Sequence, residues 1–133
     1  LYSSAASDVY KRQLQEAAVV GLKFGDDYYK WLQDKYTHMR SLFLDGLDRI
    51  GIQHSIPQGA YYVMVDVSEF GYSSDLKLCE ALAQYVGVGA VPGSSFFKEP
   101  ENRYIRLHFA KQDVSYNAAL ERLSDIRKKL PKE

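Results

Sequence analysis

The chain has 133 residues, 46% of them hydrophobic, and its 17 basic and 17 acidic side chains give a formal net charge of zero. This length suits one ordinary domain with its own core. The charge balance argues against nucleic-acid binding, because the only basic run, Arg127 to Lys129, suits a helix C-terminus. No apolar run approaches the roughly 20 residues of a membrane span. We therefore expect a protein without membrane or nucleic-acid partners, located in the cytoplasm or in an organelle.

Cysteine and histidine usage argues against disulfides and metals. Cys79 is the only cysteine, so no intrachain disulfide can form, and its place on the apolar side of a predicted helix indicates a buried, inert thiol. His38, His54 and His108 fall in three different predicted elements without the spacing of metal ligands. The sequence therefore predicts no metal site.

The first half of the chain is predicted to be mainly helical. Residues 1–13 show neither helical nor strand periodicity and resemble a translated adapter, so we expect a non-native segment and leave it out of the fold prediction. Residues 14–24 favour a helix that ends at Gly25. An apolar stripe at helical spacing predicts a longer helix over residues 26–50, ended by Gly51.

The middle of the chain alternates strands with one helix. Residues 53–56 and 60–67 flank the turn residues 57–59 and are predicted to pair as antiparallel strands. A helix is expected to begin at Ser74 or Asp75, with its buried face formed by Leu78, Leu82 and Tyr85, and to end at Gly87. Residues 88–91 then suggest a short strand.

The last third is predicted to hold one strand and one helix. Residues 104–110 alternate as a strand, and a helix capped by Asp113 is expected to run to Leu130. Helices with one apolar stripe and strands with one apolar face indicate an α/β fold of two layers, in which a small mixed sheet carries helices on a single face.

Arg106 is the most informative residue of the predicted strand. Alternation places Ile105, Leu107 and Phe109 on the core face and Arg106 on the opposite face. A guanidinium held by a strand suits bidentate capture of a carboxylate, although an arginine in this position also fits a solvated edge or a structural ion pair. Both interpretations remain open at this point.

Other catalytic signals are weak. Ser94 and Ser95 follow a Pro-Gly turn, but the G-x-S-x-G pattern of a serine nucleophile is missing. The same loop lacks the glycine pattern that cradles phosphates. We therefore assign no catalytic residue to the chain.

Six short motifs follow one another along the chain: Gln15-x-Ala-Ala18, Pro57-x-Gly-Ala-Tyr-Tyr62, Gly87-Val88, Val91-Pro-Gly-Ser-Ser-Phe96, Tyr104-x-Arg-Leu-x-Phe-Ala110 and Ala119-x-x-Arg-Leu123. In this order and spacing they resemble the carboxy-terminal part of class I/II, fold-type-I aminotransferases that depend on pyridoxal phosphate. The branch that they resemble most contains the kynurenine, glutamine and methionine aminotransferases.

The resemblance implies a division of the chain and a role for its residues. Residues 14–25 would be the tail of a missing large cofactor domain, and residues 26–133 the small domain of a homodimeric enzyme. Arg106 would bind the α-carboxylate of the substrate, with Ser94 and Phe96 as further substrate contacts. The residues that hold pyridoxal phosphate belong to the large domain in this family, so no cofactor residue is assigned here and the chain alone should not transaminate.

Two other functions fit the same residues. A cysteine-conjugate β-lyase would use the same scaffold and the same carboxylate-binding arginine, and a non-catalytic, aminotransferase-like domain would bind an effector. The sequence does not distinguish them, nor does it identify the amino donor or the 2-oxo acid.

Overall fold

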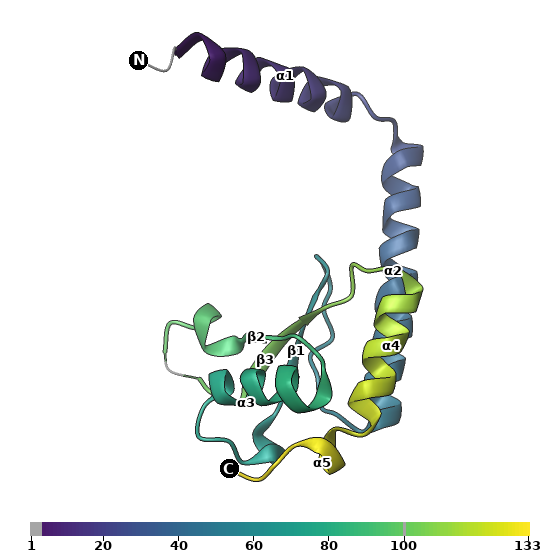
Figure 1. The fold of residues 1–133 in the computed structure, drawn as a ribbon. Helices are drawn as coiled ribbons and strands as arrows, with labels where there is room; N and C mark the ends of the chain where they lie inside the picture. Colours follow the sequence, from purple (N-terminus) through teal and green to yellow (C-terminus); the bar gives the residue numbers. More distant parts are fainter. Residues whose placement is uncertain (1–3, 100) are drawn as a thin grey trace. The chain divides into compact units, whose positions relative to one another are not determined.

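The computed structural model describes residues 4–99 and 101–133, which form two compact units (Figure 1). The first ends at Lys35 and contains α1 (Ser4–Leu22) and the first turns of α2 (Asp26–Ile50). Helix α1 includes residues 4–13, which were left out of the fold prediction because they show no helical periodicity. These residues contain neither Gly nor Pro, so nothing in them interrupts a helix. Residues 1–3 lie outside the described part, and the non-native origin of this segment stays a prediction.

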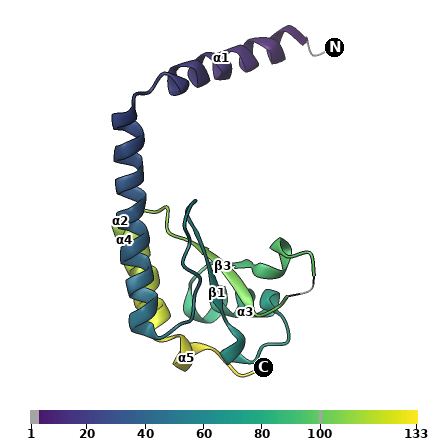
Figure 2. The same ribbon diagram turned by 180° about the vertical axis from the view of Figure 1, so that it is seen from behind.

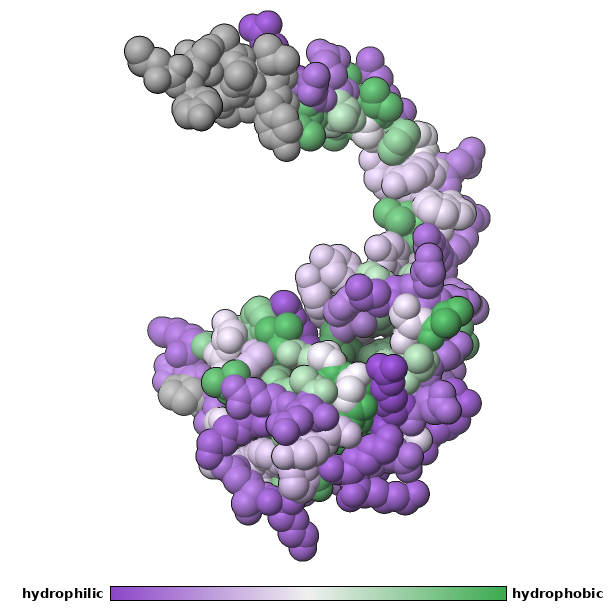
Figure 3. Space-filling model, in the orientation of Figure 1, coloured by the Kyte–Doolittle hydropathy of each residue, from purple (hydrophilic) through white to green (hydrophobic). Residues whose placement is uncertain are grey.

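The first unit exposes many apolar side chains. Tyr28 contacts Phe24, with ring centroids 4.4 Å apart, but Trp31 is 54% exposed and Leu22 is 81% exposed. Hydrophobic side chains appear green on the surface of this unit in the space-filling view (Figure 3). An apolar surface of this kind in water normally marks a contact with another part of a protein. The assignment of residues 14–25 to a further domain stays a prediction.

The second unit, Tyr36–Glu133, is built on a three-stranded sheet with the order β1-β3-β2. The strands are β1 (Tyr62–Asp66), β2 (Val91–Pro92) and β3 (Tyr104–His108). Both pairings are antiparallel, where a mixed sheet was expected, because β2 returns to β3 through one connecting segment and needs no crossover.

All four expected strands are shorter in the structure: residues 60–67 retain Tyr62–Asp66, residues 104–110 retain Tyr104–His108, and the other two are reduced further. Residues 53–56 form only an isolated bridge, His54 to Val65, flanked by backbone hydrogen bonds from Ser55 to Met64 and from Asp66 to Gln53. The expected antiparallel pairing is therefore confirmed, but not a full strand. Residues 88–90 are likewise not part of the sheet.

The predicted two-layer arrangement is confirmed. Val63, Val65, Ile105 and Leu107 point to one face of the sheet and are buried. They share one core with side chains of the helices, so these cover the same face (Figures 1 and 2). The helical members of this core are Phe43, Leu47, Leu78, Cys79, Leu82, Val86, Tyr116, Leu120, Leu123 and Ile126.

The helix after residue 74 changes its winding halfway. Ser74 caps α3 (Asp75–Ala81) by accepting a hydrogen bond from the Lys77 amide, as predicted. A π-helical turn, η2 (Leu82–Val86), follows. Its wider winding inserts a residue, so that Val86 is buried and Tyr85 is 49% exposed. The prediction that Tyr85 shares the buried face was therefore wrong.

The predicted last helix is divided in two. Helix α4 (Asp113–Ser124) is followed, after Asp125, by the short α5 (Ile126–Lys129). Gln112 is the N-cap and makes no side-chain cap hydrogen bond, whereas Asp113 lies in the first turn, so the predicted cap was one residue off. The break still leaves Leu123 and Ile126 buried, as the apolar stripe requires.

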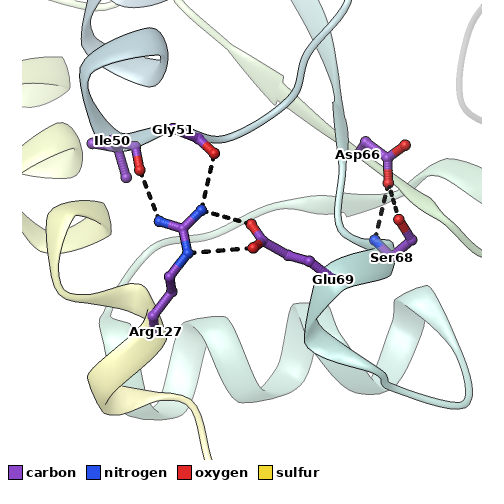
Figure 4. A network of polar contacts seen from close by, with 6 residues as sticks. All are labelled: Ile50, Gly51, Asp66, Ser68, Glu69 and Arg127. Atoms are coloured by element: carbon purple, nitrogen blue, oxygen red, sulfur yellow. Dashed lines mark hydrogen bonds and ion pairs between the residues drawn. The ribbon is translucent and has the colours of Figure 1, made fainter.

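Arg127 joins α5 to the end of α2 (Figure 4). Its guanidinium donates to the carbonyls of Ile50 at 2.7 Å and Gly51 at 2.9 Å, and it pairs with Glu69 at 2.8 Å. Gly51 has a φ of 74°, the left-handed conformation that ends a helix, as its place in the sequence predicted. Arg127 therefore satisfies the free carbonyls that this helix end leaves.

Cys79 is buried, as expected, and burial is the main cause that raises the pKa of its thiol from 9.0 to about 11. At pH 8 this two-unit rise predicts alkylation by iodoacetamide about 100-fold slower than that of an exposed thiol, since only the thiolate reacts. Mass spectrometry of the folded chain, with the urea-unfolded chain as control, measures both rates. Equal rates would contradict the burial of Cys79.

Candidate functional site

Arg106 occupies the middle position of the central strand β3, on the sheet face that the helices leave uncovered. In the pairing register it lies opposite Met64 of β1 and Val91 of β2. Its side chain is half-buried, between the buried Ile105 and Leu107. The predicted alternation of β3 is confirmed, and it places the guanidinium on a sheet rather than on a loop.

Two aromatic rings contact the Arg106 guanidinium. Its Cζ atom lies 4.1 Å from the centroid of the Tyr62 ring and 3.9 Å from that of Phe96. Tyr62 belongs to β1 and Phe96 to the 3-10 helix η3 (Gly93–Phe96) after β2, so the rings come from the two neighbours of β3. Both distances are well within the range of cation–π contacts.

Among the described residues, no side chain forms an ion pair or a hydrogen bond with Arg106. The same-face carboxylate on β1, Asp66, is engaged elsewhere: Arg103 approaches it at 2.7 Å and Ser68 donates to it at 2.6 Å. Burial opposes its ionisation, but these contacts outweigh burial and lower the pKa of Asp66. The guanidinium of Arg106 thus has no carboxylate partner among the described residues.

Two titratable groups whose pKa the charge of Arg106 affects, Tyr61 and His108, carry no negative charge at neutral pH. The hydroxyl of Tyr62 donates to that of Tyr61 at 2.9 Å, and this contact is the main cause that raises the pKa of Tyr61. Burial, followed by the charges of Lys111 and Arg106, lowers the pKa of His108, so this imidazole is neutral at pH 7. An anion approaching Arg106 therefore meets no competing charge from these groups.

Ser94 forms two hydrogen bonds with the carboxylate of Asp75. Its amide donates to the Asp75 carboxylate at 2.7 Å and its hydroxyl donates to the same group at 3.1 Å. Asp75 is only 2% exposed and lies in the first turn of α3, where the helix dipole favours a carboxylate. These bonds fix the start of η3, which carries Phe96.

Gly93 allows the loop and β3 to approach closely. A Cβ atom at this position would lie 2.3 Å from the Tyr104 carbonyl oxygen, a contact that side chains do not make. The glycine is required here by space and not by its backbone angles. It holds the start of η3 against the strand that carries Arg106.

We expect Gly93→Ala to destabilise the protein by about 1–3 kcal/mol, because β3 and the loop must separate to admit the methyl group. Urea unfolding of the chain measures this change. Gly89→Ala is the matched control, since a Cβ there has no atom within 4 Å. A Gly93→Ala variant as stable as the control would contradict the close packing of loop and strand.

The structure brings Arg106 and Phe96 together and directs Ser94 to Asp75. The roles of the three residues as substrate contacts stay predictions. Sequence reasoning missed Tyr62, although alternation along β1 places it on the Arg106 face, diagonal to that residue. It also missed Asp75, for which the sequence offered only the role of helix start.

Two kinds of feature are absent from the described residues. No helix in this part of the chain is both long and apolar enough to span a bilayer. The described histidine, cysteine and acidic side chains form no group of three that could hold a metal ion.

Comparisons with known proteins identify the family of this chain. Residues 2–123 match the family model described as "Aminotransferase class I and II". Methionine aminotransferase of Escherichia coli is 32% identical over 79% of this chain, and kynurenine–oxoglutarate transaminase of Dictyostelium discoideum is 28% identical over 86% of it. The solved structure of N-succinyldiaminopimelate aminotransferase from Mycobacterium tuberculosis superposes with a TM-score of 0.74, at 30% identity over 83% of this chain.

The chain therefore belongs to the class I and II aminotransferases. It covers 28% of the E. coli protein, 31% of the D. discoideum protein and 29% of the M. tuberculosis protein. The relatives include methionine and kynurenine aminotransferases, as the motifs predicted.

Proposed function

We propose that this chain is the small domain of an aminotransferase that moves an amino group from an α-amino acid to a 2-oxo acid, and that Arg106 binds the substrate α-carboxylate. The observation that carries this proposal is a half-buried guanidinium, held on a strand by two rings and without an ion-pair partner among the described residues. A fixed guanidinium presents two parallel N–H donors to a carboxylate. Phe96 would be a further contact of the substrate beside Arg106.

Ser94 fits this site less directly than Phe96. Its hydroxyl is already donated to Asp75, but an oxygen retains lone pairs and can still accept. We propose that Ser94 acts mainly by fixing the loop, and that any contact with substrate is secondary. Ser94 would then belong to the site chiefly because its two hydrogen bonds to Asp75 hold the loop in place.

The family in general depends on pyridoxal phosphate, but the described residues around Arg106 do not fit this group. A lysine for the cofactor aldehyde is missing from the contacts of Arg106, and three lysines of this unit pair with acids: Lys77 with Glu133, and Lys128 and Lys129 with Asp125. We propose that the cofactor is held by a large domain outside this chain. Arg106 then acts on the substrate alone.

Binding the carboxylate at Arg106 fixes the orientation of the α-carbon. Correct orientation of a reacting bond by all the groups of an active site together lowers the activation free energy by several kcal/mol. Residues 26–133 would supply this function, residues 14–25 would lead from the large domain, and the complete enzyme would be a homodimer in the cytoplasm.

An assay of the complete enzyme separates this proposal from the β-lyase alternative. The enzyme is mixed with L-methionine or L-kynurenine and a 2-oxo acid, and the amino acid formed from the acceptor is measured. A cysteine conjugate without an acceptor is the second substrate. Formation of the new amino acid supports the proposal. Release of pyruvate and thiol alone would favour the lyase, and neither product would favour an effector-binding domain.

A further inference from the structure

The two rings that contact Arg106 are placed to control how the guanidinium meets its ligand. At about 4 Å, each ring centroid is close to the guanidinium carbon itself and not only to its hydrogens. A ring in that place covers a face of the group and leaves the N–H edge open. Tyr62 belongs to β1, a neighbour of β3, and Phe96 to η3, which follows the other neighbour, β2, so the two contacts come from separate segments of the chain.

Each ring is itself held in place. The Tyr62 ring lies 4.3 Å from that of Tyr61, to which its hydroxyl also donates. Tyr61 in turn lies 6.3 Å from Tyr36 of α2. Phe96 ends η3, whose first residues are fixed by the Gly93 approach and by the bonds of Ser94.

We propose that Tyr62 and Phe96 are positioning residues that orient the Arg106 guanidinium for in-plane binding of the substrate carboxylate. This inference rests on the function proposed above for Arg106. The two rings would hold the guanidinium in place, since it has no ion pair or hydrogen bond with a described side chain. An arginine side chain has many rotamers, and two stacked rings restrict them before the substrate arrives. The rings also displace water from the guanidinium faces, which strengthens the charged hydrogen bonds at its edge.

The test measures the binding of a carboxylate that cannot react because it has no amino group. In the complete enzyme, the inhibition constant of 3-phenylpropanoate is determined for Tyr62→Leu and Phe96→Leu, with 3-phenylpropanamide as the uncharged control. We expect each leucine variant to raise the inhibition constant of the acid about 3- to 10-fold, the range of a cation–π contact. The amide should be unaffected, and the KM of the amino acid should rise more than kcat falls.

Ring-conserving variants separate positioning from folding. Tyr62→Phe and Phe96→Tyr keep a ring at each place and should change the constant less than about 2-fold, a fraction of one such contact. In an Arg106→Ala background the leucine replacements should add no further loss, because the rings act through the guanidinium. A further loss in that background would overturn the inference.

The inference and the proposed function can fail separately. If Arg106→Ala raises the inhibition constant of 3-phenylpropanoate but both leucine variants leave it unchanged, the positioning role is overturned. The assignment of Arg106 as the carboxylate-binding residue then stands. If Arg106→Ala leaves the inhibition constant unchanged, the carboxylate assignment itself falls, and the positioning role with it.

Discussion

Arg106→Ala in the complete enzyme should lower kcat/KM for α-amino acids by about 10²- to 10³-fold, because the substrate carboxylate would lose a charged, two-point partner in a partly desolvated place. The KM should rise steeply, since the lost contact exists before reaction, and kcat should fall as well, since the α-carbon is less well oriented. Steady-state kinetics with one amino acid and one 2-oxo acid give both constants.

Two further variants show whether this loss is specific. Arg106→Lys should restore little, because an ammonium lacks the planar pair of donors. Arg103→Ala removes an arginine just before the same strand, but one that is already paired with Asp66 and is 52% exposed. It should change kcat/KM by less than about 3-fold, in keeping with the small contribution of surface ion pairs. Equal effects of Arg103→Ala and Arg106→Ala would contradict the assignment.

Asp75→Ala should destabilise the chain by about 2–4 kcal/mol, the largest expected effect on stability. The buried carboxylate accepts both the amide and the hydroxyl of Ser94, and both donors would lose their partner. Urea unfolding measures the loss. Because these bonds fix the start of η3, the KM of the complete enzyme should also rise.

Two further variants of the Asp75–Ser94 contact are expected to destabilise the chain less than Asp75→Ala. Ser94→Ala removes only the hydroxyl bond and should cost about 1 kcal/mol. Asp75→Asn keeps one acceptor oxygen and should fall between the two. If Asp75→Ala were no more destabilising than Ser94→Ala, the amide bond would have no measurable importance.

Alternation and helical spacing predicted the parts of the fold that depend on one chain segment at a time. The pattern Ile105, Arg106, Leu107 identified both faces of β3, and the glycines at 51 and 87 marked two helix ends correctly, with φ angles of 74° and 75°. These features follow from local geometry, which the sequence contains directly.

Features that depend on packing between segments were not predictable in the same way. The π-helical turn at Leu82–Val86 exposes Tyr85, although helical spacing placed it beside Leu82. The strands are shorter than their β-propensity indicated, because a residue counts as strand only where a neighbour pairs with it. The sheet order β1-β3-β2 likewise depends on partners far apart in the sequence.

The candidate site shows the same division. Arg106 followed from strand alternation together with family resemblance, and Phe96 from resemblance alone. Tyr62 required the register of β1 against β3, and the Asp75–Ser94 contact required the three-dimensional path of the loop. Side chains brought together from separate elements thus remained outside what spacing alone could predict.

The most direct test of the central claim is the coding sequence upstream of Leu14, read from the source transcript. The account predicts that the frame continues into a large α/β domain containing a lysine for the cofactor and an aspartate for its ring nitrogen. A frame that begins near Leu14, or that lacks this lysine, would contradict an aminotransferase function and leave Arg106 as a ligand-binding residue only.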